Sequence, residues 1–176
     1  MQDRRELFLE LFQVVDILAR EGVGGLLVTH DREEALALSH RVAVLGGTDS
    51  KGSTLLQVGS PQDVYCKPVN LEAAQLTGRV SMLQGDSGTV LLVRPEEASF
   101  TACDDGDAHV TARRYTGGGW ELHVDTPGGE LLINHDLQDP PEPGARGRVQ
   151  LTTERSLAKK PLEAPDEGEQ GGSIGG

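Results

Sequence analysis

The spacing of apolar residues changes near Gly78, and this change divides the chain into two regions. Before it, apolar residues recur every three to four positions or gather in short runs, as in the helices and buried strands of an α/β layer. After it, short strand-like runs alternate with Gly, Pro and Asp clusters, which indicates a small barrel or sandwich. We predict an α/β region over 1–79, a β-barrel over 80–157 and a disordered acidic, glycine-rich tail over 158–176.

The first region contains patterns for four helices and three strands. An amphipathic helix is predicted over 4–21, with Gly22 as its stop, and an apolar run predicts a buried strand over 25–29. Asp31 has the position of a helix N-cap, and Glu34 follows it with capping-box spacing. Further strands are predicted over 41–45 and 54–58, joined by a turn at 46–53, and short helices over 61–65 and 71–76, capped by Ser60 and Asn70.

The second region carries more acidic charge than the first. The whole chain has 28 acidic and 16 basic residues, with a net charge of -12, of which -9 falls after residue 79. Nucleic-acid binding starts from a basic surface, so this composition argues against it. Strands are predicted here over 90–94, 109–115, 120–125, 130–134 and 148–152.

One motif in the first region carries chemistry. The run Leu27-Val28-Thr29-His30-Asp31-Arg32-Glu33-Glu34-Ala35 places His30 at the carboxyl end of the predicted strand, where open α/β sheets bind ligands. The run resembles the switch-histidine segment of ABC transporter ATPases, V-T-H-D-x-x-E-A. The resemblance continues through 43–45, the Q-V-G-x-P segment at 57–65, and Pro68. It implies that the α/β region is the end of a nucleotide-binding domain.

The resemblance assigns His30 a contact with the γ-phosphate of ATP, and it implies ATP and Mg²⁺ as cofactors of the complete subunit. The sequence, however, has no Walker A loop, no L-S-G-G-Q signature and no apolar run ending in Asp-Glu. In the nearest glycine-rich segment, Lys51 precedes its glycine, so we interpret 46–53 as a hairpin turn. We therefore expect no ATP hydrolysis by this chain alone, because the phosphate cannot be positioned.

A second motif, Val93-Arg94-Pro95-Glu96, resembles the V-R-P-E of the TOBE domain, an OB-like barrel appended to many importer ATPases. Segments 115–117 and 144–149 fit the same family. The resemblance implies the C-terminal part of an importer's ATP-binding subunit, bound to membrane permease subunits and to a second ATPase subunit. Its place would be cytoplasmic, peripheral on the inner face of the plasma membrane. For Arg94 and Glu96 both effector binding and a local ion pair remain open.

A stand-alone binding module, a small barrel that senses an anion or a regulatory protein, is the alternative function. Cys66 and Cys103 form no C-x-x-C pair and are expected to be free thiols. His109, His123 and His135 lack the close spacing of metal ligands, so we predict no metal site. No apolar stretch approaches the length of a membrane span, and membrane association would go through a partner protein.

Overall fold

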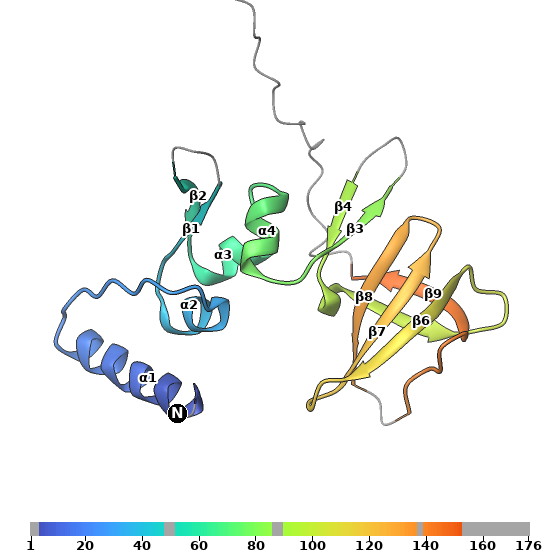
Figure 1. Ribbon diagram of the computed structural model, residues 1–176, viewed down its shortest axis with the longest axis horizontal. Helices are drawn as coiled ribbons and strands as arrows, with labels where there is room; N and C mark the ends of the chain where they lie inside the picture. Colours follow the sequence, from blue (N-terminus) through green and yellow to red (C-terminus); the bar gives the residue numbers. More distant parts are fainter. Residues whose placement is uncertain (1–3, 48–51, 86–89, 137–138, 153–176) are drawn as a thin grey trace, which may run out of the picture.

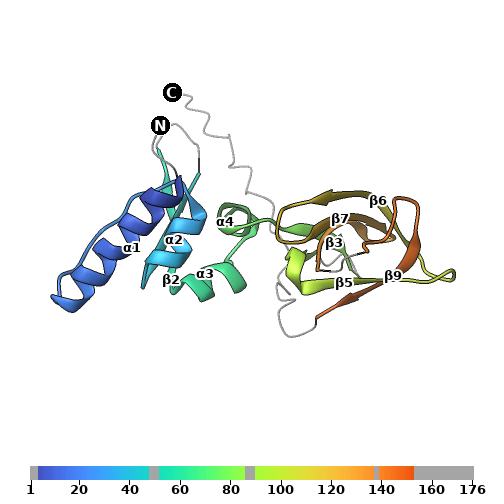
Figure 2. The same cartoon turned by 90° about the horizontal axis from the view of Figure 1, so that it is seen from below.

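The computed structural model describes residues 4–47, 52–85, 90–136 and 139–152 (Figure 1). Helices and one hairpin occupy the first part of the chain, and strands dominate after Gly78. Figure 2 shows the two parts at opposite ends of the molecule, with the last helix of the first part between them. The elements of the first part are α1 (Arg4–Arg20), α2 (Arg32–Leu38), β1 (Val42–Gly46), β2 (Thr54–Gly59), α3 (Pro61–Cys66) and α4 (Leu71–Thr77).

Helix α1 confirms the predicted first helix, and it ends as its sequence indicates. Gly22 has a φ of 66°, and the N–H of Val23 donates to the carbonyl of Leu18 at 2.9 Å. Such a left-handed residue after the last turn satisfies carbonyls that the helix leaves open. The apolar stripe of α1 is only partly covered: Leu11 and Leu18 are partly buried, whereas Phe12 is more than half exposed.

The strand predicted over 25–29 is wrong: these residues form no strand in the described structure. Leu26 is 92% exposed and Val28 is 85% exposed, the opposite of the burial that their apolar run predicts. A strand needs a neighbour to complete its hydrogen-bond ladder, and none of the described strands pairs with this segment. The run therefore crosses from α1 to α2 without regular structure, as Figure 1 shows.

Helix α2 begins at the predicted cap. The Asp31 side chain accepts hydrogen bonds from the backbone N–H groups of Glu33 and Glu34. The Glu34 carboxylate accepts a hydrogen bond from the Thr29 hydroxyl at 2.9 Å, and that hydroxyl in turn accepts from the N–H of Asp31. The cap thus fixes the residues on both sides of His30.

Strands β1 and β2 form an antiparallel hairpin, which confirms both predicted strands; residues 48–51 of its predicted turn lie outside the described residues. One face of the hairpin packs on α3 and α4, where Val44, Val64 and Ala73 are buried together. On the other face Leu45 and Leu55 are paired across the strands, and both are more than half exposed. The first part therefore has an apolar face without a covering layer.

Helices α3 and α4 confirm the last two predicted helices, and both have the predicted caps. The Ser60 hydroxyl accepts from the N–H of Asp63 at 3.1 Å, with Pro61 in the first turn. The Asn70 side chain accepts from the N–H of Ala73 at 2.8 Å, and Gly78 ends α4. The two helices lead the chain directly into the β region.

After Gly78, a five-stranded antiparallel sheet has the order β5-β9-β6-β7-β8. A separate β3–β4 hairpin lies against β8: the N–H of Leu132 donates to the Ser81 hydroxyl at 3.0 Å, and that of Gln84 to the Gly128 carbonyl at 2.7 Å. The strands are β3 (Ser81–Gln84), β4 (Val90–Val93), β5 (Ala98–Ala102), β6 (Ala108–Tyr115), β7 (Trp120–Thr126), β8 (Gly129–His135) and β9 (Arg146–Leu151).

This arrangement is consistent with an OB-like fold and confirms the five strands predicted after residue 79, while β3 and β5 were not predicted. The core is built by alternation along β7 and β8, where Leu122, Val124, Leu131 and Ile133 are fully buried. Phe100 lies directly over Gly147, and a side chain at Gly147 would collide with its ring. The α/β nucleotide-binding character of the first part, by contrast, is not evident from its elements.

Candidate functional site at the junction of the two parts

Arg94 lies where β4 ends, and it is 4% exposed. Its backbone N–H donates to Oε2 of Glu97 at 2.9 Å, which fixes the short 3₁₀ helix η2 (Pro95–Glu97). Pro95 occupies the first position of that helix, where proline's fixed φ suits the turn. The V-R-P-E run thus forms a rigid turn that aims the Arg94 side chain toward the helices.

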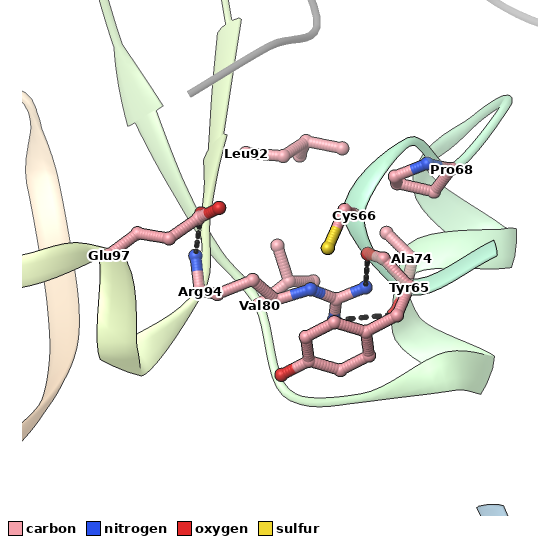
Figure 3. A pocket seen from close by; sticks show the side chains of 8 residues that line it. All are labelled: Tyr65, Cys66, Pro68, Ala74, Val80, Leu92, Arg94 and Glu97. Carbon is pink, nitrogen blue, oxygen red and sulfur yellow. Dashed lines mark hydrogen bonds between the residues drawn. The ribbon is translucent and has the colours of Figure 1, made fainter. Parts of the chain in front are cut away.

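The Arg94 guanidinium donates four hydrogen bonds across the junction. Nη1 donates to the carbonyls of Ala74 and Arg79, both at 2.9 Å. Nη2 donates to the Tyr65 carbonyl and the Thr77 hydroxyl, both at 3.0 Å. Figure 3 shows the side chain reaching from β4 past the ring of Tyr65 to Ala74. A planar guanidinium presents its donors as a fixed fork, so it can satisfy several acceptors at once.

Tyr65 connects Arg94 with Glu96. The guanidinium carbon lies 4.2 Å from the centre of the Tyr65 ring, a cation–π contact. The Tyr65 hydroxyl donates to Oε1 of Glu96 at 2.8 Å. Burial and this hydrogen bond to Glu96 raise the pKa of Tyr65 to about 12. Burial also lowers the pKa of Arg94. In the described structure, Tyr65 therefore stands between the two residues predicted to bind a ligand or pair with each other.

The junction leaves almost no empty space. The cavity there has a volume of about 10 Å³ and is lined by Tyr65, Cys66, Pro68, Ala74, Val80, Leu92, Arg94 and Glu97 (Figure 3). That volume admits about one water molecule. A larger ligand would reach Arg94 only if the junction opened.

The other predicted site residue, His30, is exposed in the segment before α2 and does not line the junction. The structure therefore does not bring His30 together with Arg94 and Glu96. Its neighbours Thr29 and Asp31 form hydrogen bonds in the cap of α2, so the backbone on both sides of His30 is held in place.

Sequence reasoning missed a buried carboxylate on the outer face of the sheet. Glu121 of β7 is 4% exposed and forms salt bridges with Arg79 and Arg114, the latter at 2.7 Å. Arg79 lies in the segment between α4 and β3, so this pair is a second link across the junction. Alternation along β7 places Glu121 on the outer face, and no sequence signal shows that an arginine from outside the sheet covers it.

The histidines of the β region are dispersed. His123 lies 2.8 Å from Glu130, and Nε2 of His109 lies 3.7 Å from Asp125. Nε2 of His135 is buried without a hydrogen-bond partner. Among the described residues, no three His, Cys, Asp or Glu side chains are arranged to hold a metal ion. In the same part of the chain, no helix has the length and apolar character needed to cross a membrane.

Residues 91–158 match the family model of the TOBE domain, TOBE_2. The putrescine transport ATP-binding protein PotG of Escherichia coli (strain K12) is 33% identical over 125 residues, which cover 64% of this chain and 30% of that protein. The spermidine/putrescine import ATP-binding protein PotA of Mesorhizobium japonicum (strain LMG 29417 / CECT 9101 / MAFF 303099) is 32% identical over 161 residues, 73% of this chain and 42% of PotA.

The Fe(3+) ions import ATP-binding protein FbpC 1 of Rhodococcus jostii (strain RHA1) is 32% identical over 99 residues, 56% of this chain and 25% of that protein. The chain spans less than half the length of each of these three relatives. The family match confirms the resemblance drawn from the V-R-P-E motif, and the relatives confirm the resemblance to importer ATP-binding subunits. The chain contains a TOBE domain and is related to the ATP-binding subunits of ABC importers.

Proposed function

We propose that this chain is the C-terminal part of an ABC importer's ATP-binding subunit, which couples ATP hydrolysis to solute uptake in the complete complex. Its permease subunits and a second ATPase subunit are the proposed partners, at the cytoplasmic face of the plasma membrane. The observation that carries the proposal is the V-T-H-D run with His30 on the same chain as the TOBE domain. In this proposal, residues 1–79 end the nucleotide-binding domain, 80–157 form the TOBE barrel and 158–176 are a tail.

The surface of the first part supports this proposal. Leu26, Val28 and the Leu45–Leu55 pair are exposed, and all of them precede the TOBE domain. Exposed apolar patches of this kind mark surfaces that pack against further protein. The relatives are more than twice as long as their matched segments, so they have additional sequence that can supply the missing layer.

His30 is the proposed contact to the γ-phosphate. Its imidazole is exposed, and an imidazole N–H can donate to a phosphate oxygen. Bound ATP would supply the phosphoryl group, and Mg²⁺ would neutralise its developing charge. The residues of this chain fit only that single contact, because the sequence has no phosphate-cradling loop. We therefore propose that the chain alone does not hydrolyse ATP.

The test is a fusion of this chain behind a matching ATPase core that carries Walker A, signature and Walker B motifs. We expect magnesium-dependent phosphate release from the fusion and none from the chain alone. His30→Ala should reduce the release by about a hundredfold, since one donor to a phosphoryl group contributes roughly that much. His40→Ala is the matched control. His40 is also exposed, and it lies just after α2, whereas His30 lies just before it. A fully active His30→Ala fusion would contradict the assignment.

The alternative is a stand-alone module that binds an anion or a regulatory protein through the barrel. The observation that favours it is the barrel core, which is complete without any residue of the first part. The ligand role of Arg94 and Glu96 belongs to this alternative and stays a prediction. Titration of the chain with sulfate or phosphate, followed by Trp120 fluorescence, distinguishes the two: saturable binding that Arg94→Met abolishes favours the module.

A further inference from the structure

Arg94 lies in the β region, but its guanidinium donates its hydrogen bonds to residues before β3. The backbone of Arg94 follows β4 and is fixed by Glu97 within the TOBE match. All four acceptors of the guanidinium lie between residues 65 and 79, on α3, on α4 and in the segment after it. The Arg94 side chain therefore bridges the two parts.

Three neighbours strengthen this bridge. The Tyr65 ring lies under the guanidinium, and the Tyr65 hydroxyl reaches Glu96 on the turn that follows Arg94. At Gly78 a Cβ atom would come within 2.7 Å of the Tyr65 ring and 3.0 Å of Nη1 of Arg94. The absence of a side chain at Gly78 thus lets ring and guanidinium stack closely.

We infer that Arg94 is a clamp that fixes α3 and α4 to the barrel, so that the helices and the barrel move as one body. Helices α3 and α4 also carry the β1–β2 hairpin through Val64 and Ala73. If the proposed function holds, the clamp transmits a displacement of the nucleotide-binding part to the TOBE barrel.

The chemistry of the bridge requires arginine. A lysine ammonium is a point charge with three donors and no planar fork, so it cannot donate to all four acceptors at once. Loss of the guanidinium would leave the Thr77 hydroxyl and three carbonyls without this donor in a place that admits about one water. The Ala74 carbonyl would still accept from the N–H of Gly78 and from the Thr77 hydroxyl. The carbonyls of Tyr65 and Arg79 would take a replacement donor from solvent, which favours opening of the junction.

The two cysteines provide a local measurement of that opening. Cys66 lines the junction, whereas Cys103 lies between β5 and β6 at a distance from it in sequence and fold. In the full chain with Cys103→Ser, the rate of Cys66 labelling by an aromatic disulfide reagent reports opening at the clamp. In the full chain with Cys66→Ser, the labelling of Cys103 gives the reference rate for a partly exposed thiol away from the clamp.

We expect Arg94→Met to accelerate Cys66 labelling by about tenfold or more, because each lost hydrogen bond to a charged group shifts the opening equilibrium. Arg94→Lys should also accelerate it, and Cys103 labelling should stay unchanged in both variants. Arg113→Met is the matched control: Arg113 also lies over an aromatic ring, that of Trp120, and donates to the Pro140 carbonyl, but within the barrel. It should leave the labelling rate of Cys66 unchanged.

An unchanged Cys66 rate in Arg94→Met would overturn the clamp. So would equal acceleration of Cys66 and Cys103, which would mean that Arg94 stabilises the whole fold. If Arg94→Met does not fold, Gly78→Ala tests the same junction by crowding Tyr65, with Gly118→Ala as control, since nothing lies within 4 Å of a Cβ there. Because labelling needs no nucleotide, failure of the clamp is distinguishable from failure of the ATPase fusion.

Discussion

The two parts of this molecule contain similar apolar runs, but the run at 25–29 is largely exposed, whereas those of β7 and β8 are buried. Leu122 and Val124 of β7 are fully buried between neighbouring strands, whereas Leu26 and Val28 are almost fully exposed. The difference is whether a neighbouring strand is available for pairing. Each central strand of the sheet has a neighbour on both sides, and the 25–29 segment has none among the described strands. An apolar run forms a strand only where a ladder partner is available.

The largest expected effect is on proteolysis. Under native conditions thermolysin should cleave within 23–30 before it cleaves anywhere in 90–136. An exposed, irregular segment opens at almost no cost, whereas sheet residues need global unfolding, so we expect a rate ratio of roughly a hundredfold or more. Mass spectrometry of the products at successive times measures this order.

The control repeats the digestion at a urea concentration at which native and partly unfolded chain are present in equal amounts. A protected fragment covering 4–60, with the barrel digested first, would show that the stable part has been assigned to the wrong side of Gly78. It would also remove the basis of the comparison between the two parts.

A pair of leucine substitutions tests the difference between the two parts one side chain at a time. Leu122→Ala should lower the free energy of unfolding of the barrel by about 2–5 kcal/mol, because it removes buried methyl groups and leaves a cavity. Leu26→Ala should change it by less than about 0.5 kcal/mol, since Leu26 is 92% exposed. Urea unfolding followed by Trp120 fluorescence measures both. Similar losses for the two variants would contradict the assignment of the core.

Local signals in the sequence predicted much of this fold. The caps Asp31, Ser60 and Asn70 and the stop Gly22 were identified from short-range chemistry, which the structure confirms. Such features need only neighbouring residues, so they form whatever the rest of the chain does. The strand at 25–29 failed because its burial depends on pairing that no local pattern can report.

For the candidate site, the sequence identified Arg94 but not its contacts. The V-R-P-E motif pointed to this residue, while its acceptors at Ala74, Thr77 and Arg79 are backbone or hydroxyl oxygens that leave no trace in the residue pattern. Strand β5 was missed for a related reason: its alternation of Ala98, Ser99, Phe100 and Thr101 is short and follows directly on the turn at Pro95–Glu97. The contacts of Arg94 and the formation of β5 both depend on residues that are distant in the sequence.

The smallest expected effect concerns the pH dependence of the junction. The pKa of Tyr65 is raised to about 12 from its ordinary value near 10, so the folded state keeps the phenol protonated where the unfolded state loses its proton. The stabilisation is complete below the unfolded pKa and is lost as the pH rises through the folded pKa. Because Tyr65 is only partly buried, solvent screening reduces the effect to about 1 kcal/mol. Urea unfolding at successive pH values between 8 and 11.5 measures it.

Tyr65→Phe keeps the ring under Arg94 but removes both the titrating group and the hydrogen bond to Glu96. This variant should be less stable than the parent chain at pH 8 and should lose less stability toward pH 11.5, so that the two curves approach each other. Tyr115→Phe is the control, because Tyr115 is 62% exposed at the far end of β6 and donates only to the Gly117 carbonyl. Parallel curves for Tyr65→Phe and the parent chain would show that the Tyr65 hydroxyl does not hold the two parts together, and the link would then rest on the Arg94 guanidinium and the Arg79–Glu121 pair.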